Sequence, residues 1–308
     1  MLEQFEILKK FFMSLPWEQI WIEATSTRVY VEVMRKYQIF SGIVIFWLGC
    51  NIGSFLNVCI YRLPLKMSLF RPKSHCPKCN HQLSWYENIP LFSYLFLWGS
   101  CKECGIHISP RYWIVELTTG LLFAASYLKV SYLQLPLPTM LLMFFVISIL
   151  LCCAFTDCDL RVIPDTLTIT AMIIVPVYYL LHKGLFPLQP DWKSLWICLA
   201  NMAGAAFVMS AFTLLGRFLF KRDAFGWGDV KYLVVVAGTF GWFPTVLILA
   251  ASSVIAMIYM PIYWCFRPKR KRRGFAFAPF MTICAFIWMF SAEFVMRSVV
   301  LFFRKDGL

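Results

Sequence analysis

The sequence predicts an all-α polytopic membrane protein with about eight transmembrane helices and a small cytoplasmic zinc-binding loop domain. Apolar residues make up 60% of its 308 residues and aromatic residues 18%, and the mean hydropathy is +0.69. A soluble domain of this length cannot bury so much apolar surface. Long apolar runs recur along the chain, and a loop between two of them carries four cysteines in two CxxC pairs.

The apolar runs define the expected transmembrane spans in order. Stretches of about 20 apolar residues occur near 39–60, 112–129, 138–156, 166–182, 195–216, 230–246, 246–265 and 279–303. The boundary between the sixth and seventh spans is the least marked, because only Gly238, Gly241 and Pro244 signal a turn there. The sequence therefore predicts eight spans with one uncertain division.

The N-terminal segment differs in composition from the spans. Its first 37 residues mix acidic and basic residues with recurring Phe, Leu, Ile and Trp, which we interpret as an amphipathic segment on the membrane surface. A disordered tail is the alternative, and we expect no removable signal peptide. The expected organisation is a surface segment at 1–37, a first transmembrane helix at 38–60, a zinc-binding domain at 61–111 and a membrane-embedded domain at 112–308.

Basic residues orient the predicted bundle. They gather in the connections at 61–111, Arg161, 217–231 and 267–273, whereas the alternate loops hold only Lys129, Lys183 and Lys193. The positive-inside rule therefore places the first set in the cytoplasm and both chain termini on the opposite side. The net charge of +13 then needs no nucleic-acid partner, because topology and anionic lipid headgroups account for it. A nucleic-acid patch at 267–273 is the alternative.

Asp157 and Asp229 are the candidate functional residues, because each lies at the edge of a long apolar stretch. A carboxylate kept at the membrane is costly, and such residues usually serve ions, protons or chemistry. The predicted topology places both at the cytoplasmic face, where they can meet. Two adjacent carboxyl groups cannot easily both ionise, so one acts as an acid and the other as a base. This chemistry suits hydrolysis of a peptide bond.

Residues around the two aspartates are expected to support them. Gly226 and Gly228 let the backbone approach a partner closely, although GxGD alone also fits a turn whose aspartate caps a helix. Asp165, after Pro164, is expected to start a helix. Asp159 is either a second polar support or a solvated interface residue. The expected supporting set is Gly226, Gly228, Lys231, Asp159, Pro164 and Asp165.

Two further acidic residues fall inside apolar spans and are not expected to be catalytic. Glu116, near the cytoplasmic end of its span, is expected to pair with Arg111 or Arg62. Glu293 is expected to pair with Arg297, four residues further along the same helix.

The two CxxC pairs predict a metal site. Cys76 and Cys79 form the first pair, and Cys101 and Cys104 form the second. Four thiolates at such spacing suit one tetrahedral structural zinc, whereas two disulfides would not persist in a reducing cytoplasm. The flanking histidines, at 75, 81 and 107, are alternative ligands. The other eight cysteines read as buried apolar residues.

Five ordered blocks resemble the bacterial type IV prepilin peptidases, which belong to the GxGD aspartyl intramembrane proteases. The blocks are GCNIGSFLNVCIYRLP, then HCPKCNHQLSWYENIPLFSYLFLWGSCKECGIHISPRYWIVELTTGLL, then TDCDLRVIPD, GWGDVK and FAPF, between residues 49 and 280. The family often has FGP where this chain has Phe277-Ala278-Pro279, and RYP where it has Arg111-Tyr112-Trp113. Neither departure affects the two aspartates.

The resemblance implies an enzyme with two activities. Asp157 and Asp229 would be the catalytic pair that removes the leader after a glycine in type IV prepilins or pseudopilins, and the four cysteines would hold zinc. The new N-terminal residue would then be N-methylated from S-adenosylmethionine, an activity that the family associates with the cysteine loop and with Gly99. It also implies a bacterial inner-membrane location with periplasmic termini. No motif in the sequence independently indicates a methyl-donor site.

Two other functional classes fit parts of the pattern. A proton- or cation-coupled transporter would also keep carboxylates in the membrane, but the sequence shows no inverted repeat or pair of matching broken helices. A non-catalytic scaffold presenting a zinc module would leave both aspartates replaceable. Membrane lipid is an expected partner in every case.

Overall fold

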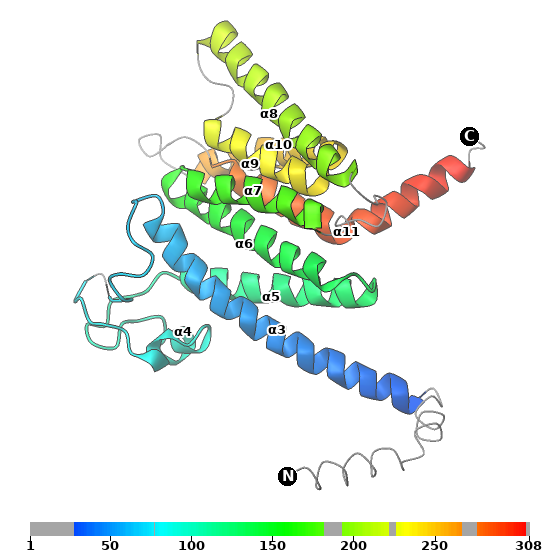
Figure 1. Ribbon diagram of the computed structural model, residues 1–308. Coiled ribbons are helices and arrows are strands. Elements are labelled where there is room, and N and C mark those ends of the chain that lie inside the picture. Colours follow the sequence, from blue (N-terminus) through cyan, green and yellow to red (C-terminus); the bar gives the residue numbers. More distant parts are fainter. Residues whose placement is uncertain (1–27, 77, 182–192, 222–225, 267–275, 306–308) are drawn as a thin grey trace. The chain divides into compact units, whose positions relative to one another are not determined.

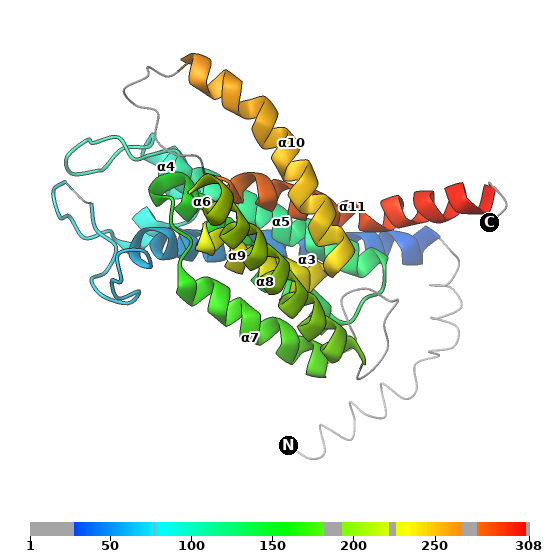
Figure 2. The same ribbon diagram turned by 90° about the horizontal axis from the view of Figure 1, so that it is seen from above.

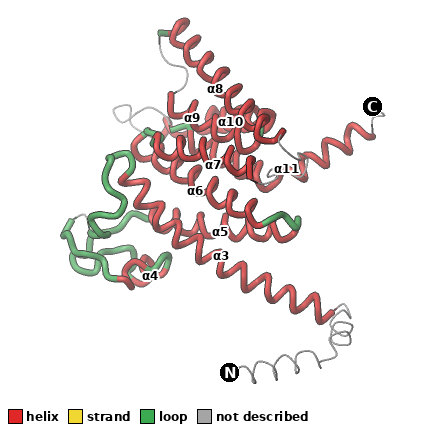
Figure 3. Tube along the Cα trace, viewed as in Figure 1, coloured by secondary structure: helices red, strands yellow, loops and turns green. Residues whose placement is uncertain are grey.

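The computed structural model describes residues 28–76, 78–181, 193–221, 226–266 and 276–305. Within these ranges the regular structure is helical and contains no strand (Figure 3). Extended backbone pairs only in two isolated bridges, His75 with Gln82 and Ser100 with His107. The prediction of an all-α fold is therefore confirmed.

Eight long helices in the described ranges follow the order of the eight expected spans (Figure 1). They are α3 (Arg28–Arg62), α5 (Arg111–Tyr132), α6 (Leu137–Leu160), α7 (Asp165–Leu181), α8 (Lys193–Phe220), α9 (Trp227–Phe240), α10 (Trp242–Phe266) and α11 (Ala278–Lys305). The connection between α3 and α5 holds two shorter elements, the 3-10 helix η1 (Trp85–Asn88) and α4 (Phe92–Phe96).

Five segments in the described ranges are long and apolar enough to cross a membrane, so the protein is polytopic. They are Tyr37–Arg62, Arg111–Tyr132, Leu137–Leu160, Lys193–Leu219 and Trp242–Tyr263. Asp165–Leu180 and Ala278–Glu293 are apolar but shorter. Helix α9 has 14 residues and spans ~21 Å, less than the ~30 Å hydrocarbon core of a bilayer. The count of eight spans and the cytoplasmic side therefore stay predictions.

The least marked boundary in the sequence is a real break between two helices. Gly241 separates α9 from α10 with φ of 92°, a value that favours glycine, and donates its N–H to the carbonyl of Ala237 at 2.9 Å. Pro244 follows in the first turn of α10, where a missing N–H costs little. The turn signals in the sequence thus identified the correct place.

The chain divides into two compact units, residues 1–45 and 46–308. The described part of the first is the N-terminal portion of α3, from residue 28 to residue 45. The predicted surface segment falls largely on residues 1–27, which lie outside the described ranges. The second unit contains both candidate sites.

Glycines allow α3 and α5 to pack backbone to backbone within the second unit. A methyl group added at Gly49 would lie 2.8 Å from Cα of Gly120, and one at Gly53 would lie 2.7 Å from Cα of Glu116. Small residues four apart are a common interface between membrane helices, since close approach increases van der Waals contact. The side chain of Asn57 also donates to the carbonyl of Tyr112 at 3.0 Å. The two helices therefore run antiparallel in tight contact.

Helix α9 is buried among its neighbours. Every residue from Val230 to Phe240 except Lys231 is buried, as expected for a helix that is apolar on all sides. It lies next to α7 and α8 (Figures 1 and 2) and also contacts α10 and α11. Tyr232 shares a hydrogen bond of 2.7 Å with Thr282 of α11, whose hydroxyl lies 3.3 Å from the carbonyl of Leu150 in α6. This chain of contacts joins α9, α11 and α6 in the core that carries the candidate site.

Candidate active site and metal centre

Asp157 lies in the last turn of α6, where the helix leaves the core. Its Oδ2 accepts the N–H of Ala278 at 3.0 Å, and the N–H of Phe277 also contributes. These groups belong to the N-terminus of α11, where free N–H groups and the helix dipole favour an anion. The residue is 7% exposed. Arg161, at φ of 57°, ends α6 by donating its N–H to the carbonyl of Asp157.

Asp229 lies in the first turn of α9. Gly226 is the residue before this helix, and its N–H donates to the carboxylate of Asp229. A side chain at Gly226 would crowd this carboxylate, because an added methyl group would lie 3.2 Å from Oδ2. The glycine thus leaves space beside the acidic group.

A second glycine brings the start of α9 close to the end of α6. A methyl group at Gly228 would lie 3.1 Å from Cβ of Ile163, in the connection between α6 and α7. Lys231 reaches the residue that follows this connection and donates to Oδ1 of Asp165, the first residue of α7, at 2.6 Å. As a result, the first turn of α9, which carries Asp229, lies against the segment that directly follows the end of α6, which carries Asp157.

The remaining predicted supporting residues lie on α6 and at the start of α7. Pro164 directly precedes α7 and accepts the N–H of Leu167 at 3.2 Å, and Asp165 is the first residue of that helix. Asp159 forms an ion pair with Arg111, the first residue of α5. Its contact therefore links α6 to α5 rather than to α9.

Two acidic side chains inside the apolar helices have different partners from those expected. The sequence suggested that Glu116 pairs with Arg111 or Arg62, but its carboxylate accepts the N–H of Leu91 at 2.8 Å. Arg62 instead donates to three loop carbonyls, those of Ser68, Leu69 and Pro72. Glu293 lies 3.6 Å from Nζ of Lys129 on α5, and its expected partner Arg297 has a side chain outside the described residues.

The four predicted zinc ligands converge. The sulfur atoms of Cys76, Cys79, Cys101 and Cys104 all lie within 4.8 Å of one another. The Sγ atoms of Cys76 and Cys104 are 3.7 Å apart, and those of Cys79 and Cys101 are 3.9 Å apart. Four ligands at a Zn–S distance of ~2.3 Å in a tetrahedron require sulfur separations of ~3.8 Å. The cluster therefore fits zinc, and none of the four cysteines forms a disulfide bond.

Backbone N–H groups favour the thiolate form of Cys76, the first of the four cysteines. The N–H groups of Cys79 and Lys78 point at the sulfur of Cys76 and lower the pKa of that thiol to about 6. A thiolate is the form that binds zinc. The three histidines have other partners, namely Lys73 for His75, Glu87 for His81 and Ser100 for His107. The cysteines are therefore the ligands that the geometry favours.

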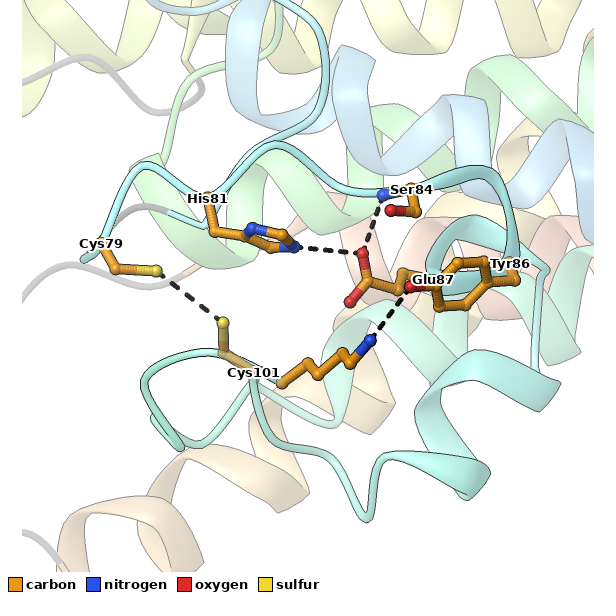
Figure 4. A network of polar contacts seen from close by, with 7 residues as sticks. Cys79, His81, Ser84, Tyr86, Glu87 and Cys101 are labelled. Carbon is orange, nitrogen blue, oxygen red and sulfur yellow. Dashed lines mark hydrogen bonds and ion pairs between the residues drawn. The ribbon is translucent and has the colours of Figure 1, made fainter.

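A buried carboxylate braces the loop beside the cysteine cluster (Figure 4). Oε2 of Glu87 accepts the N–H of Ser84 at 2.8 Å and lies 3.2 Å from Nε2 of His81. The Ser84 N–H lowers the pKa of Glu87, although burial acts in the opposite direction. The neighbouring hydroxyl of Tyr86 accepts from Lys102 at 3.1 Å, next to Cys101. These two contacts tie the middle of the loop to both cysteine pairs.

Gly99 stands between the second cysteine pair and α4. Its φ is +61°, and an added methyl group would lie 2.8 Å from the ring and hydroxyl of Tyr94. The carbonyl of Gly99 accepts the N–H of Ile108 at 2.7 Å, and the Tyr94 hydroxyl donates to the Ile108 carbonyl at 3.3 Å. The backbone conformation and the close contact both exclude a larger residue without rearrangement.

Comparisons with known proteins match both parts of this arrangement. Residues 47–130 match the family described as Bacterial Peptidase A24 N-terminal domain, and residues 144–261 match the Type IV leader peptidase family. A protein of Klebsiella pneumoniae named prepilin leader peptidase/N-methyltransferase is 35% identical over 232 residues, which cover 72% of this chain and 96% of the relative. The chain belongs to the type IV leader peptidase family.

Other family members give matches of different extent. A protein of the same name from Myxococcus xanthus is 40% identical over 65% of this chain, but the match spans 56% of that relative. Its counterpart from Neisseria gonorrhoeae is 29% identical over 82% of this chain and 91% of the relative. No solved structure matches the chain. The family resemblance stated from the sequence motifs is therefore confirmed.

Several contacts in this family member were not predicted from the aspartates alone. The N–H groups of Phe277 and Ala278 hold Asp157, and Ile163 sets the approach of α9. The FAPF block that carried part of the resemblance was the signal for the first two, because it precedes and starts α11. No pattern distinguishes Ile163 from other apolar residues at a helix end.

Proposed function

We propose that the chain cleaves the leader of type IV prepilins or pseudopilins after a glycine, with Asp157 and Asp229 as the catalytic pair. It then N-methylates the new N-terminal residue with S-adenosylmethionine as co-substrate. The observation that supports cleavage most directly is the packing of the first turn of α9, which carries Asp229, against the connection that follows Asp157 at the end of α6, in a chain whose relatives are named prepilin leader peptidase/N-methyltransferase.

Two carboxyl groups that share one site provide the chemistry for this reaction. One proton shared by the pair leaves one group neutral and the other anionic, and the pair titrates as a unit. The anionic group takes a proton from water as the water attacks the peptide carbonyl, and the neutral group donates to the developing oxyanion. Either aspartate can fill either role, so both are required.

The surroundings of Asp229 favour an extended substrate. Gly226 is exposed, so substrate backbone can approach the carboxylate of Asp229 from this side without meeting a side chain at that position. A leader peptide must leave its helix before its carbonyl reaches the pair. The basic loops repel a basic leader, and recognition therefore rests on the apolar segment after the cleavage site.

The cysteine loop has a separate role in this proposal. Cys76, Cys79, Cys101 and Cys104 hold one structural zinc, which joins the two halves of the loop and keeps Gly99 in place. We assign methyl transfer to this loop, with Gly99 as the residue whose conformation matters. The enzyme acts at the cytoplasmic face of the bacterial inner membrane, with the zinc loop in the cytoplasm and both termini in the periplasm.

A direct test is incubation of the purified protein with a detergent-solubilised prepilin and S-adenosylmethionine. The mass of the pilin N-terminus is expected to show loss of the leader after a glycine and the addition of one methyl group. Omitting S-adenosylmethionine should leave the cleaved, unmethylated product. An intact leader for every pilin and pseudopilin tested, with a correctly folded enzyme, would contradict the peptidase assignment.

Replacing Gly99 by alanine is expected to reduce methylation at least ~10-fold, because the added methyl group displaces Tyr94 and strains a left-handed backbone by ~1–2 kcal/mol. Leader removal should change less than twofold. Gly105→Ala is the matched control, since Gly105 has φ of +65° but no atom within 4 Å of an added methyl group. N-terminal mass spectra measure both activities. Equal loss of methylation in the two variants would attribute the effect to backbone strain alone.

A further inference from the structure

The loop between α3 and α5 contains an apolar stretch that the cysteine cluster does not require. No charged residue occurs between Glu87 and Lys102. Within this stretch Leu95 is 55% exposed, Phe96 78% and Trp98 88%. Contiguous large apolar side chains at a surface mark an interaction site, so the partner that covers them must be identified.

The position of α4 along α3 identifies the partner. The ring of Phe92 stacks on that of Trp47 with centroids 5.2 Å apart and an interplanar angle of 19°. Trp47 precedes Arg62, the end of α3, by fifteen residues, which is ~22 Å along the helix axis. The segment Tyr37–Arg62 is apolar enough to cross a membrane. Phe92 therefore lies beside the membrane-spanning part of α3, and Figure 1 shows α4 beside this helix instead of beyond its end.

A second contact holds the start of this segment beside the N-terminal part of α5. The N–H of Leu91 donates to Oε2 of Glu116 at 2.8 Å. Glu116 is five residues into α5 from Arg111, or ~7 Å along the axis. Leu91 has φ of 63°, a conformation that costs an L-residue free energy. A buried carboxylate that binds this N–H stabilises the turn which directs the chain toward Trp47.

The backbone of the segment suits an apolar environment. Unpaired N–H groups are costly in lipid, but those in this stretch bond to carbonyls a few residues earlier. The bonded groups are the N–H of Phe92, Ser93, Leu95, Leu97, Trp98 and Gly99, at 2.7–3.3 Å. The groups that Leu95 and Phe96 present to their surroundings are therefore apolar side chains.

We propose that residues 91–98 are embedded in the bilayer beside α3, and that lipid acyl chains cover Leu95 and Phe96. Trp98 lies at the boundary with the charged part of the loop, where tryptophan is favoured at membrane interfaces. The loop is thus anchored in the membrane between its two cysteine pairs. This places part of the predicted cytoplasmic domain at 61–111 within the lipid.

Photo-crosslinking tests this placement. Phe96 is replaced by p-benzoyl-phenylalanine, and the full chain is reconstituted in nanodiscs of phosphatidylethanolamine and phosphatidylglycerol. The control carries the same group at Phe70, which is 85% exposed in the same loop but follows the end of α3 and adjoins Arg71. After irradiation, intact-protein mass spectrometry is expected to show several times more lipid adduct at position 96 than at position 70.

The alternative outcomes are distinguishable. Equal or lower lipid adduct at position 96 would overturn the proposal, as would crosslinking of position 96 to a second protein chain in place of lipid. Elution volume and zinc content equal to those of the unsubstituted protein show that each labelled chain is folded. Neither position belongs to the carboxylate pair or the cysteine cluster, so the result does not depend on catalysis.

Discussion

Replacing Asp157 or Asp229 by asparagine is expected to abolish leader removal while the protein still folds and inserts. Asparagine has the same shape as aspartate but cannot act as an acid or a base at this site. General acid–base catalysis contributes ~10²–10⁴-fold to rates. When two groups act as a unit, removing one of them lowers the rate about as much as removing both. The double variant should therefore be no slower than either single variant. The measurement is the rate of leader removal by purified enzyme.

The fold should tolerate these substitutions because the local contacts survive. The amide oxygen of asparagine at position 157 can still accept the N–H of Ala278. Asp159→Asn and Asp165→Asn are suitable controls, since these carboxylates lie in the same region but bind Arg111 and Lys231. Both are expected to retain most activity. Substantial cleavage by Asp157→Asn or Asp229→Asn enzyme would refute the assignment of the pair.

The helices could be predicted because each depends on a local pattern. Apolar runs located all eight, and Gly241 with Pro244 marked the break between α9 and α10. The cysteine cluster was equally accessible, since two CxxC pairs restrict the geometry of a metal site whatever the surrounding fold. In these cases short-range chemistry was sufficient.

Contacts between distant residues could not be predicted in the same way. A single sequence does not reveal how far one helix is displaced along another. For this reason Glu116 was expected to pair with Arg111 or Arg62, whereas its partner is the N–H of Leu91. The same limitation hid the stacking of Phe92 on Trp47. The packing of Gly49 against Gly120 and of Gly53 against Glu116 sets the level at which α3, α5 and the loop meet.

The two sites occupy different elements, and this predicts that their activities separate. The carboxylate pair depends on α6, α9 and α11, whereas the cysteine cluster lies in the connection between α3 and α5. The described contact between Asp159 and Arg111 joins these regions at the start of α5. Disturbance of the loop should therefore affect methyl transfer more strongly than peptide cleavage.

Replacing Cys101 by serine is expected to release the zinc and abolish methyl transfer. Structural zinc contributes an apparent binding free energy of ~10–16 kcal/mol that is coupled to folding, so losing a buried ligand disorders the loop. Wild-type protein purified without chelator should contain about one zinc per chain, and the variant close to none. Metal analysis measures the loss of zinc, and limited proteolysis measures the disorder of the loop. Incubation with labelled S-adenosylmethionine and a cleaved pilin measures methyl transfer.

Cys265→Ser is the matched control, because Cys265 is an exposed thiol outside the cluster and its loss should change neither zinc content nor methyl transfer. Leader removal by Cys101→Ser enzyme should persist at a reduced rate, since the backbone groups that hold Asp157 come from α11 and not from the loop. Wild-type protein without bound metal would contradict the zinc assignment. If Cys101→Ser enzyme lost cleavage and methylation equally, the loop would have to position the carboxylate pair as well, and the separation of the two activities would be wrong.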